Sequence, residues 1–246
     1  LMTLLLMTPA QALPLQDAVQ TALANNPNLQ RTEQSIRTAE ESLKSARGRK
    51  GVTVSASGSV NASKTEGVDD SERASTGISA SLPLYSGGRL EAAIKSAELG
   101  IEISKLDFAQ SQDDLIYQVA TAYVNALENL ATSKVDYETE QNLSAHERMI
   151  GEQFAAGAKA KIDLLRAQVE TSNALQNAAR SHAAYEVALV NLAALMSTDS
   201  IANLTVEDFE TNLAVEDVEK YLAEADENRR DLKADVLRIE QGELDV

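Results

Sequence analysis

The sequence predicts a mainly α-helical fold built around one long antiparallel, coiled-coil-like helical hairpin, preceded by a β-hairpin. Apolar and small residues step by four and three from about 88 to 196, the spacing of helices packed as coiled coils. Between about 52 and 85 the period changes to two, which indicates strands. Residues 218–246 also resemble 15–43, which predicts an internal repeat.

Composition excludes several classes of function. The chain has no cysteine, which rules out disulfides, thiolate metal sites and cysteine nucleophiles in this sequence. A net charge of −16 argues against nucleic-acid binding, which needs a basic surface. Aromatic residues make up only 4%, so we expect long helices packed through small side chains rather than a large globular core.

The first twelve residues are typical of the end of a signal peptide. An apolar run ending at Met7 precedes Ala10-Gln11-Ala12, which fits a cleavage site. We therefore expect export, with a mature protein beginning at Leu13; a frayed apolar terminus is the alternative. No 18 apolar residues run together after residue 12, which argues against a transmembrane helix.

The first helical region runs from Leu13 to about Arg47. Asn25-Asn26-Pro27 interrupts it, because proline is tolerated at the start of a helix but not inside one. Gly48 and Gly51 end the region.

Two alternating segments follow. One runs from Val52 to Val60; after a polar stretch over 61–73 the other runs from Thr76 to Leu84. Strands of about ten residues match the length that crosses a bilayer when tilted. A solvent-exposed hairpin is the alternative that this pattern leaves open.

The helical hairpin should consist of a helix over about 88–154, a turn at Gly157 and a returning helix to 196. Glycine suits the turn because it adopts the left-handed conformation readily. Two neighbouring stripes on the returning helix predict two helical neighbours, as in a closed ring of helices. The first stripe comprises Leu164, Gln168, Thr171, Leu175, Ala178, His182, Tyr185, Leu189, Leu192 and Met196, and the second Ile162, Leu165, Val169, Ser172, Ala179, Ala183 and Val190.

A short packed connection is expected over 201–212, followed by the second repeat. At a constant offset, Ala22 matches Ala225, Asn25 matches Asn228, Leu29 matches Leu232, Ile36 matches Ile239 and Glu40 matches Glu243. We therefore expect residues 13–217 to form a first repeat and 218–246 the beginning of a second, which is cut short.

Three segments carry a resemblance to the TolC family of outer-membrane efflux and secretion channels. Ala22 to Leu29 (ALANNPNL) is similar to the family's opening segment. Leu82 to Arg89 (LPLYSGGR) resembles its strand-to-helix transition, including Pro83, Gly87 and Gly88. The stretch from Gly157 through Asp163 to Gln168 resembles the tip and returning helix of its periplasmic hairpin. The strands depart from the family in lacking an aromatic girdle, with only Tyr85 near an end, and Arg230 stands where the first copy has Pro27.

The resemblance implies a homotrimer in which each subunit contributes four strands to a shared outer-membrane β-barrel and helices to a periplasmic tunnel. This chain holds two of those strands. The implied function is a passive outer-membrane exit duct of a tripartite efflux pump or type I secretion system, working with a periplasmic adaptor and an inner-membrane transporter. The cargo, whether a small molecule or a polypeptide, is not specified by any motif.

The resemblance also implies roles for two groups of tip residues. Asp163 falls where family members narrow the periplasmic end of the tunnel, and Ala156, Gly157 and Ala158 fall at the adaptor-docking tip. For Asp163 the alternative is a helix N-terminal carboxylate that is stabilised by the helix dipole.

No residues form a catalytic, cofactor or metal motif. His146 and His182 have no metal-pair spacing, Asp69-Asp70 and Asp113-Asp114 read as solvated surface, and Gly87-Gly88 lacks a phosphate-loop pattern. We therefore expect no enzyme and no cofactor. The rival function is a periplasmic adaptor with a helical hairpin, against which the internal repeat and the strands speak; a structural coiled-coil surface protein is a third possibility.

Overall fold

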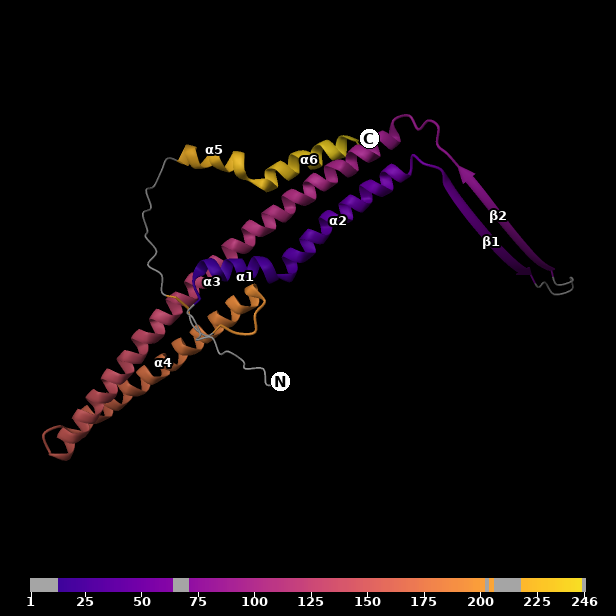
Figure 1. Cartoon of the computed structure of the whole chain (residues 1–246). Coiled ribbons are helices and arrows are strands. Elements are labelled where there is room, and N and C mark those ends of the chain that lie inside the picture. Colours follow the sequence, from indigo (N-terminus) through magenta and orange to yellow (C-terminus); the bar gives the residue numbers. More distant parts are fainter. Residues whose placement is uncertain (1–12, 64–70, 202–203, 206–217, 245–246) are drawn as a thin grey trace, which may run out of the picture. The chain divides into compact units, whose positions relative to one another are not determined.

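The computed structural model describes residues 13–63, 71–201, 204–205 and 218–244. The elements are α1 (Leu15–Asn25), α2 (Pro27–Gly48), β1 (Thr53–Ser63), β2 (Ser71–Ser81), α3 (Arg89–Ala155), α4 (Lys161–Met196), α5 (Val218–Asn228) and α6 (Arg230–Leu244), as Figure 1 shows. The predicted signal-peptide end and most of the predicted connection lie outside the described residues. The chain divides into two compact units, Leu1–Gln30 with Ser111–Val215, and Arg31–Gln110 with Glu216–Val246.

The break between α1 and α2 lies at Asn26, inside the predicted interruption. Its buried side chain accepts hydrogen bonds from the backbone N–H of Asn28 (2.9 Å) and of Leu29 (3.3 Å), which caps α2. Its Nδ2 donates to the carbonyl of Leu195 at the end of α4 (3.0 Å). One asparagine therefore starts α2 and also ties the break to α4.

The first helix of the hairpin, α3, agrees with its predicted bounds to within a residue or two. It has 67 residues and is about 100 Å long at 1.5 Å per residue. Contacts between the two helices include a hydrogen bond from the Thr171 hydroxyl to the carbonyl of Leu143 (3.2 Å). No helix in the described ranges combines the length and apolarity needed to cross a membrane.

The predicted first stripe of α4 was wrong at three of its ten positions. Gln168, Leu175 and His182 are exposed, and the residues that precede them by one position are buried: Ala167, Ala174 and Ser181. The predicted positions Leu164, Thr171, Ala178, Tyr185, Leu189, Leu192 and Met196 are buried or half-buried. Small side chains fill the seam because they let two helix backbones approach, which a Leu at every step would prevent.

Tyr123 of α3 joins three separated segments in the first unit. Its ring is fully buried, and its hydroxyl lies 2.8 Å from the carbonyl of Leu13 and 2.8 Å from that of Thr205. Leu13 also forms a parallel bridge with Leu204. Sequence reasoning missed this residue, because nothing in the local sequence marks a hydrogen-bond partner so far away.

In the second unit, α3 carries ion pairs to helices on both sides. Arg47 at the end of α2 pairs with Glu98 (2.8 Å), whereas Arg238 of α6 pairs with Asp107 (2.8 Å) and Glu240 pairs with Lys95 (2.7 Å). Glu240 raises the pKa of the Lys95 ammonium. These pairs are half exposed, so each adds little stability, but together they identify the sides of α3 on which α2 and α6 lie.

Replacing Tyr123 with Phe should lower the free energy of unfolding by about 1 kcal/mol, because the hydrogen bond that the buried hydroxyl donates to a backbone carbonyl is lost. The measurement is the urea midpoint followed by far-ultraviolet circular dichroism. Tyr137→Phe is the control, since Tyr137 lies on the same helix with 61% of its surface exposed. Equal midpoints for the two variants would contradict the role of the hydroxyl.

Candidate channel surfaces

The two strands form an antiparallel hairpin with one apolar face and one hydroxyl face. Pairing runs without a bulge from Thr53 opposite Ser81 to Ser63 opposite Ser71. The register places on one face the pairs Val54–Ala80, Ala56–Ile78, Gly58–Thr76 and Val60–Ala74, and on the other Thr53–Ser81, Ser55–Ser79, Ser57–Gly77, Ser59–Ser75 and Asn61–Arg73.

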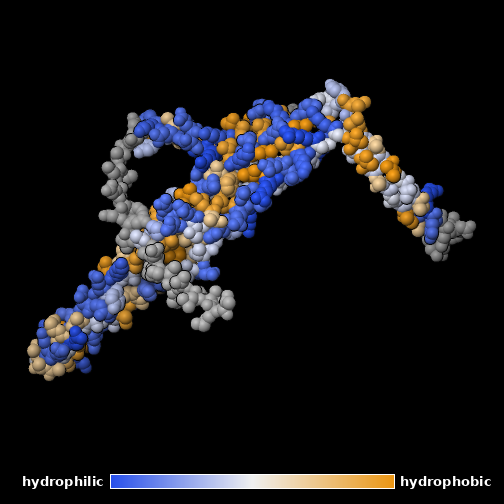
Figure 2. Space-filling model, viewed as in Figure 1, coloured by the Kyte–Doolittle hydropathy of each residue, from blue (hydrophilic) through white to orange (hydrophobic). Residues whose placement is uncertain are grey.

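Both faces are open. Val60 and Ile78 of the apolar face are 79% and 83% exposed, and Figure 2 shows hydrophobic residues along the strands. The Ser59 and Ser75 hydroxyls are 2.8 Å apart on the other face. Within the described strand residues, charge occurs only at Glu72 and Arg73, beside the connecting loop. Sequence analysis found the alternation, but the pairing of hydroxyls depends on the register.

The hairpin is shifted relative to the predicted one. The strands continue to Ser63 and restart at Ser71, inside the predicted polar loop, and β2 ends at Ser81. Leu82 and Leu84, predicted to continue the alternation, therefore lie beyond the strand. Pro83 accounts for this end, because it has no N–H to donate to a ladder.

The strand-to-helix transition contains Pro83, Gly87 and Gly88 as expected. Gly87 and Gly88 have φ angles of 63° and 88°, which residues with a Cβ rarely adopt. The Ser86 hydroxyl accepts a hydrogen bond from the N–H of Leu90 (3.3 Å) in the first turn of α3. Leu84 and Tyr85, between strand and helix, are 90% and 91% exposed.

An ion pair holds the same transition from the other side. Lys50, which precedes β1, lies 2.8 Å from Glu91 in the first turn of α3. The hydrogen bond from Lys50 lowers the pKa of the Glu91 carboxyl. The ion pair therefore places the residue before β1 next to the first turn of α3.

Gly157 forms the tip turn as predicted. Its φ is 74°, its N–H donates to Phe154 (2.9 Å), and the N–H of Ala158 donates to Gln153 (2.8 Å). These two bonds are the Schellman pattern that ends α3. Ala156, Gly157 and Ala158 are all exposed, so the candidate docking tip is an open surface of small side chains.

Asp163 lies in the first turn of α4 and is half-buried. Its Oδ2 accepts a hydrogen bond from the backbone N–H of Ala160 (3.3 Å), while its own N–H donates to the Ala160 carbonyl (3.0 Å). Asp163 therefore caps the N-terminus of α4, in agreement with its alternative interpretation as a helix N-terminal carboxylate. Any further role of Asp163 would depend on its negative charge and on its other carboxylate oxygen, Oδ1.

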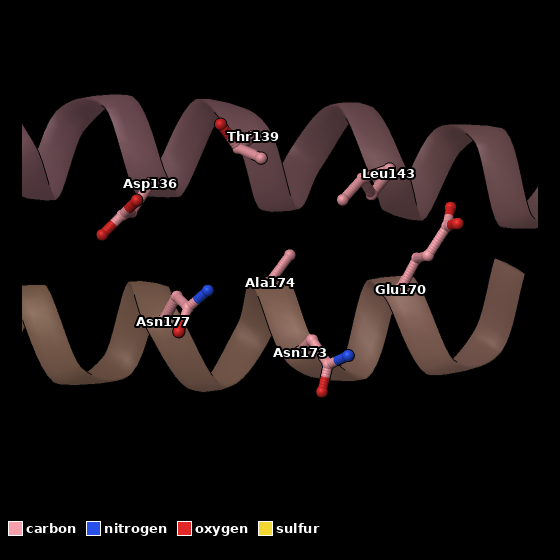
Figure 3. Close-up of a pocket in the computed structure, with 7 residues that line it drawn as sticks. All are labelled: Asp136, Thr139, Leu143, Glu170, Asn173, Ala174 and Asn177. Carbon is pink, nitrogen blue, oxygen red and sulfur yellow. The ribbon is translucent and has the colours of Figure 1, made fainter.

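A shallow groove lies between α3 and α4 away from the tip (Figure 3). Ala174 forms its buried floor, and polar side chains from both helices stand along its edges. The lining comprises Asp136, Thr139, Leu143, Glu170, Asn173, Ala174 and Asn177. Carboxamides and carboxylates that are open to solvent suit contact with another polar helix better than enclosure of a small ligand.

The described residues contain no cluster of three or more histidine, cysteine or carboxylate side chains that would hold a metal ion. His146 and His182 are both exposed and lie on different helices. On the buried side of α4, desolvation raises the pKa of the Tyr185 hydroxyl.

The long helical hairpin and the two-stranded antiparallel sheet make this a mainly helical protein with a small sheet. The model of the outer membrane efflux protein family matches residues 18–198. Since the match covers most of the chain, the protein belongs to this family. Among curated protein sequences, none matches the chain.

Solved structures share the fold. The outer-membrane channel OprN has a TM-score of 0.73 at 20% identity, over 94% of this chain and 54% of that one. A membrane protein from Pseudomonas aeruginosa gives 0.74 at 21%, over 94% and 56%. The open state of the Neisseria gonorrhoeae MtrE outer membrane channel gives 0.65 at 19%, over 94% and 53%. The chain thus spans about half the length of these channels. The resemblance to TolC-family channels and the mainly helical fold are confirmed.

Gly157→Val should destabilise the tip by roughly 1–2 kcal/mol, because a β-branched residue adopts the left-handed conformation poorly. No atom lies within 4 Å of the added Cβ, so the penalty is one of backbone conformation rather than crowding. Limited proteolysis between α3 and α4 should become faster. Ala158→Val adds similar bulk at a neighbouring exposed position without a positive φ, and it should be cleaved at the wild-type rate.

Proposed function

We propose that this chain is part of a passive exit duct in the outer membrane, through which an efflux or secretion system expels its cargo. The observation that carries the proposal is the strand pair with two open faces of opposite polarity, joined through a short transition to a helix of 67 residues. Membership in the outer membrane efflux protein family supports the location and the class of function.

The polarity of the strand faces suggests which solvent each one meets. The apolar face fits lipid, because the pairs Val54–Ala80, Ala56–Ile78 and Val60–Ala74 present only hydrocarbon side chains. The hydroxyl face fits a water-filled lumen. Strands of 11 residues are long enough to cross the hydrocarbon core when tilted. Exposed Leu84 and Tyr85 at the helical end would then lie at the membrane interface.

A two-stranded hairpin cannot stand alone in lipid, since its outer edges would leave backbone groups unpaired. Closure therefore needs further strands, which a second repeat and neighbouring subunits of a homotrimer would supply. The helix bounds support the repeat: α5 and α6 are separated by one residue, Arg229, as α1 and α2 are by Asn26, and their starts follow at the same offset. In place of the asparagine cap, Arg229 pairs with Asp231 and lowers the pKa of that carboxyl to about 2.

The helical hairpin would serve the periplasmic side of the duct. Its tip, with exposed Ala156 and Ala158, offers a low surface on which a periplasmic adaptor could pack its own helices, linking the duct to an inner-membrane transporter. The duct itself catalyses nothing in this proposal, and its energy comes from the transporter. Small molecules and polypeptides are both admissible cargo.

Ile78→Arg should block assembly in the membrane, because an arginine on the lipid face near the bilayer centre costs about 2–4 kcal/mol per subunit. Ser79→Arg, one residue along on the hydroxyl face, should assemble and change only the ion conductance. Membrane fractionation and planar-bilayer recordings of the full-length protein measure both effects. If Ile78→Arg assembled normally and Ser79→Arg failed to assemble, the hydroxyl face would face lipid and the apolar face the lumen.

Asp163 can be tested as a gate separately from its capping role. Asp163→Asn removes the charge but keeps an oxygen that can accept the Ala160 N–H, whereas Asp163→Ala removes both. If the charge narrows the periplasmic entrance, both variants should raise the resting conductance of the full-length protein.

Thermal stability of the same two variants reports on the cap. A fall in stability for Asp163→Ala alone, with wild-type conductance for both variants across salt concentrations, would leave Asp163 only as a helix-terminal carboxylate.

A further inference from the structure

The stretch from Lys44 to Lys50 is the most basic part of the chain. It contains four cations and no carboxylate, whereas the whole chain has a net charge of −16. No other seven consecutive residues contain four lysines and arginines. The stretch covers the end of α2 and the start of the connection to β1, so this positive charge lies immediately before the strands.

Arg89 adds a fifth cation at the same place. It is the first residue of α3, and the ion pair between Lys50 and Glu91 (2.8 Å) holds the beginning of α3 next to the basic stretch. A cation in the first turn is unfavourable for a helix, because the N-terminal end of the helix dipole is itself positive. The charge of Arg89 therefore does not stabilise the helix that it begins.

Two of these five cations have no carboxylate to balance them. Arg49 and Arg89 are both exposed, and neither forms an ion pair with a residue that the structure describes. They flank the Lys50–Glu91 pair, one residue before Lys50 and two residues before Glu91. The other three cations are balanced in the pairs Lys44–Glu41, Arg47–Glu98 and Lys50–Glu91.

Apolar side chains lie directly beside these cations. Leu84 and Tyr85 are 90% and 91% exposed, and they line a hollow together with Lys50 and Leu90. Figure 2 shows hydrophobic surface at this end of the strands, next to the hydrophilic surface of the helices. One small region thus offers positive charge and hydrocarbon side by side.

This combination fits the chemistry of an anionic phospholipid. The guanidinium group binds phosphate oxygens through two parallel hydrogen bonds, and it keeps its charge at any pH of interest. The acyl chains of the lipid would cover apolar side chains that are otherwise exposed to water. A free phosphate ion would use the two arginines but would gain nothing from Leu84 and Tyr85.

We propose that Arg49 and Arg89 bind the headgroup phosphates of anionic phospholipids, in the membrane leaflet that meets the helical end of the strands. The inference rests on the proposed function, which places β1 and β2 in the membrane with Leu84 and Tyr85 at its interface. The two arginines then fix the depth of the strands. Moving them into hydrocarbon is costly, and moving them away from the surface loses an attraction that fades within a Debye length.

Lipid titration of the full-length protein in a non-ionic detergent tests the proposal, with bound lipids counted by native mass spectrometry. Phosphatidylglycerol, which is anionic, should bind more tightly than phosphatidylcholine, which has a phosphate but no net charge. The double variant Arg49→Gln, Arg89→Gln should weaken phosphatidylglycerol binding by roughly fivefold for each arginine and so reduce the difference between the two lipids. Neither substitution breaks an ion pair, and circular dichroism checks that the fold is kept.

The double variant Lys134→Gln, Arg180→Gln is the matched control. Both residues are exposed cations without an ion pair among the described residues, and they lie on α3 and α4 in the other compact unit. The control removes the same charge, yet phosphatidylglycerol should bind it as tightly as the wild type. An equal loss in the two double variants would reveal a general effect of net charge and contradict the proposal.

Three further results would overturn the inference: equal affinity of the wild type for the two lipids, full competition by inorganic phosphate, or dissociation of the oligomer in the Arg49 and Arg89 double variant. The last result would assign the arginines to a subunit contact. Planar-bilayer conductance separates this failure from that of the proposed function. A conducting protein without lipid preference would refute the phospholipid contact alone, whereas a protein that neither enters membranes nor conducts would refute both.

Discussion

Packing through small side chains is the constraint on which the helical hairpin depends. The buried positions of α4 alternate between residues such as Ala167, Ala174 and Ser181 and larger ones such as Leu192. This seam brings the helices near enough for the Thr171 hydroxyl to reach the backbone of α3. Helical stability in proteins comes mostly from tertiary packing rather than from intrinsic propensity, so such contacts stabilise α3.

Much apolar surface of the described residues is exposed. Val169, Leu175 and Val190 on α4, Ile239 on α6 and Ile78 on β2 are more than half exposed. In a monomer that functions in water, exposed apolar rows of this kind are unusual, and they mark surfaces that meet lipid or another chain. The open faces of the strands and of the helices both support the proposal that the chain contributes to a larger assembly in a membrane.

Two polar side chains hold the segments between these regular elements. Asn26 caps α2 and reaches α4, and Tyr123 reaches both Leu13 and Thr205. Buried polar groups need partners, and here the partners are the backbone carbonyls of Leu195, Leu13 and Thr205. These contacts connect the break between α1 and α2 to the end of α4, and Leu13 and Thr205 to α3.

Periodicity was sufficient to determine the helices, the strands and their approximate limits. The break at Asn26, the turn at Gly157 and the long α3 follow from local rules, because proline and glycine restrict or free the backbone wherever they occur. The family resemblance also rested on local segments, such as Leu82 to Arg89. The assignment of α4 positions to its buried side was wrong at Gln168, Leu175 and His182, since a large and a small residue one step apart fit the same period equally well.

Only the tertiary structure decided which of the alternating positions pair across the strands and which neighbour each helix face meets. These outcomes depend on register and on residues far away in the sequence: Ser59 meets Ser75 and Arg238 meets Asp107. The sequence by itself determined the elements, because their causes are local, and the fold decided their partners, because packing is not.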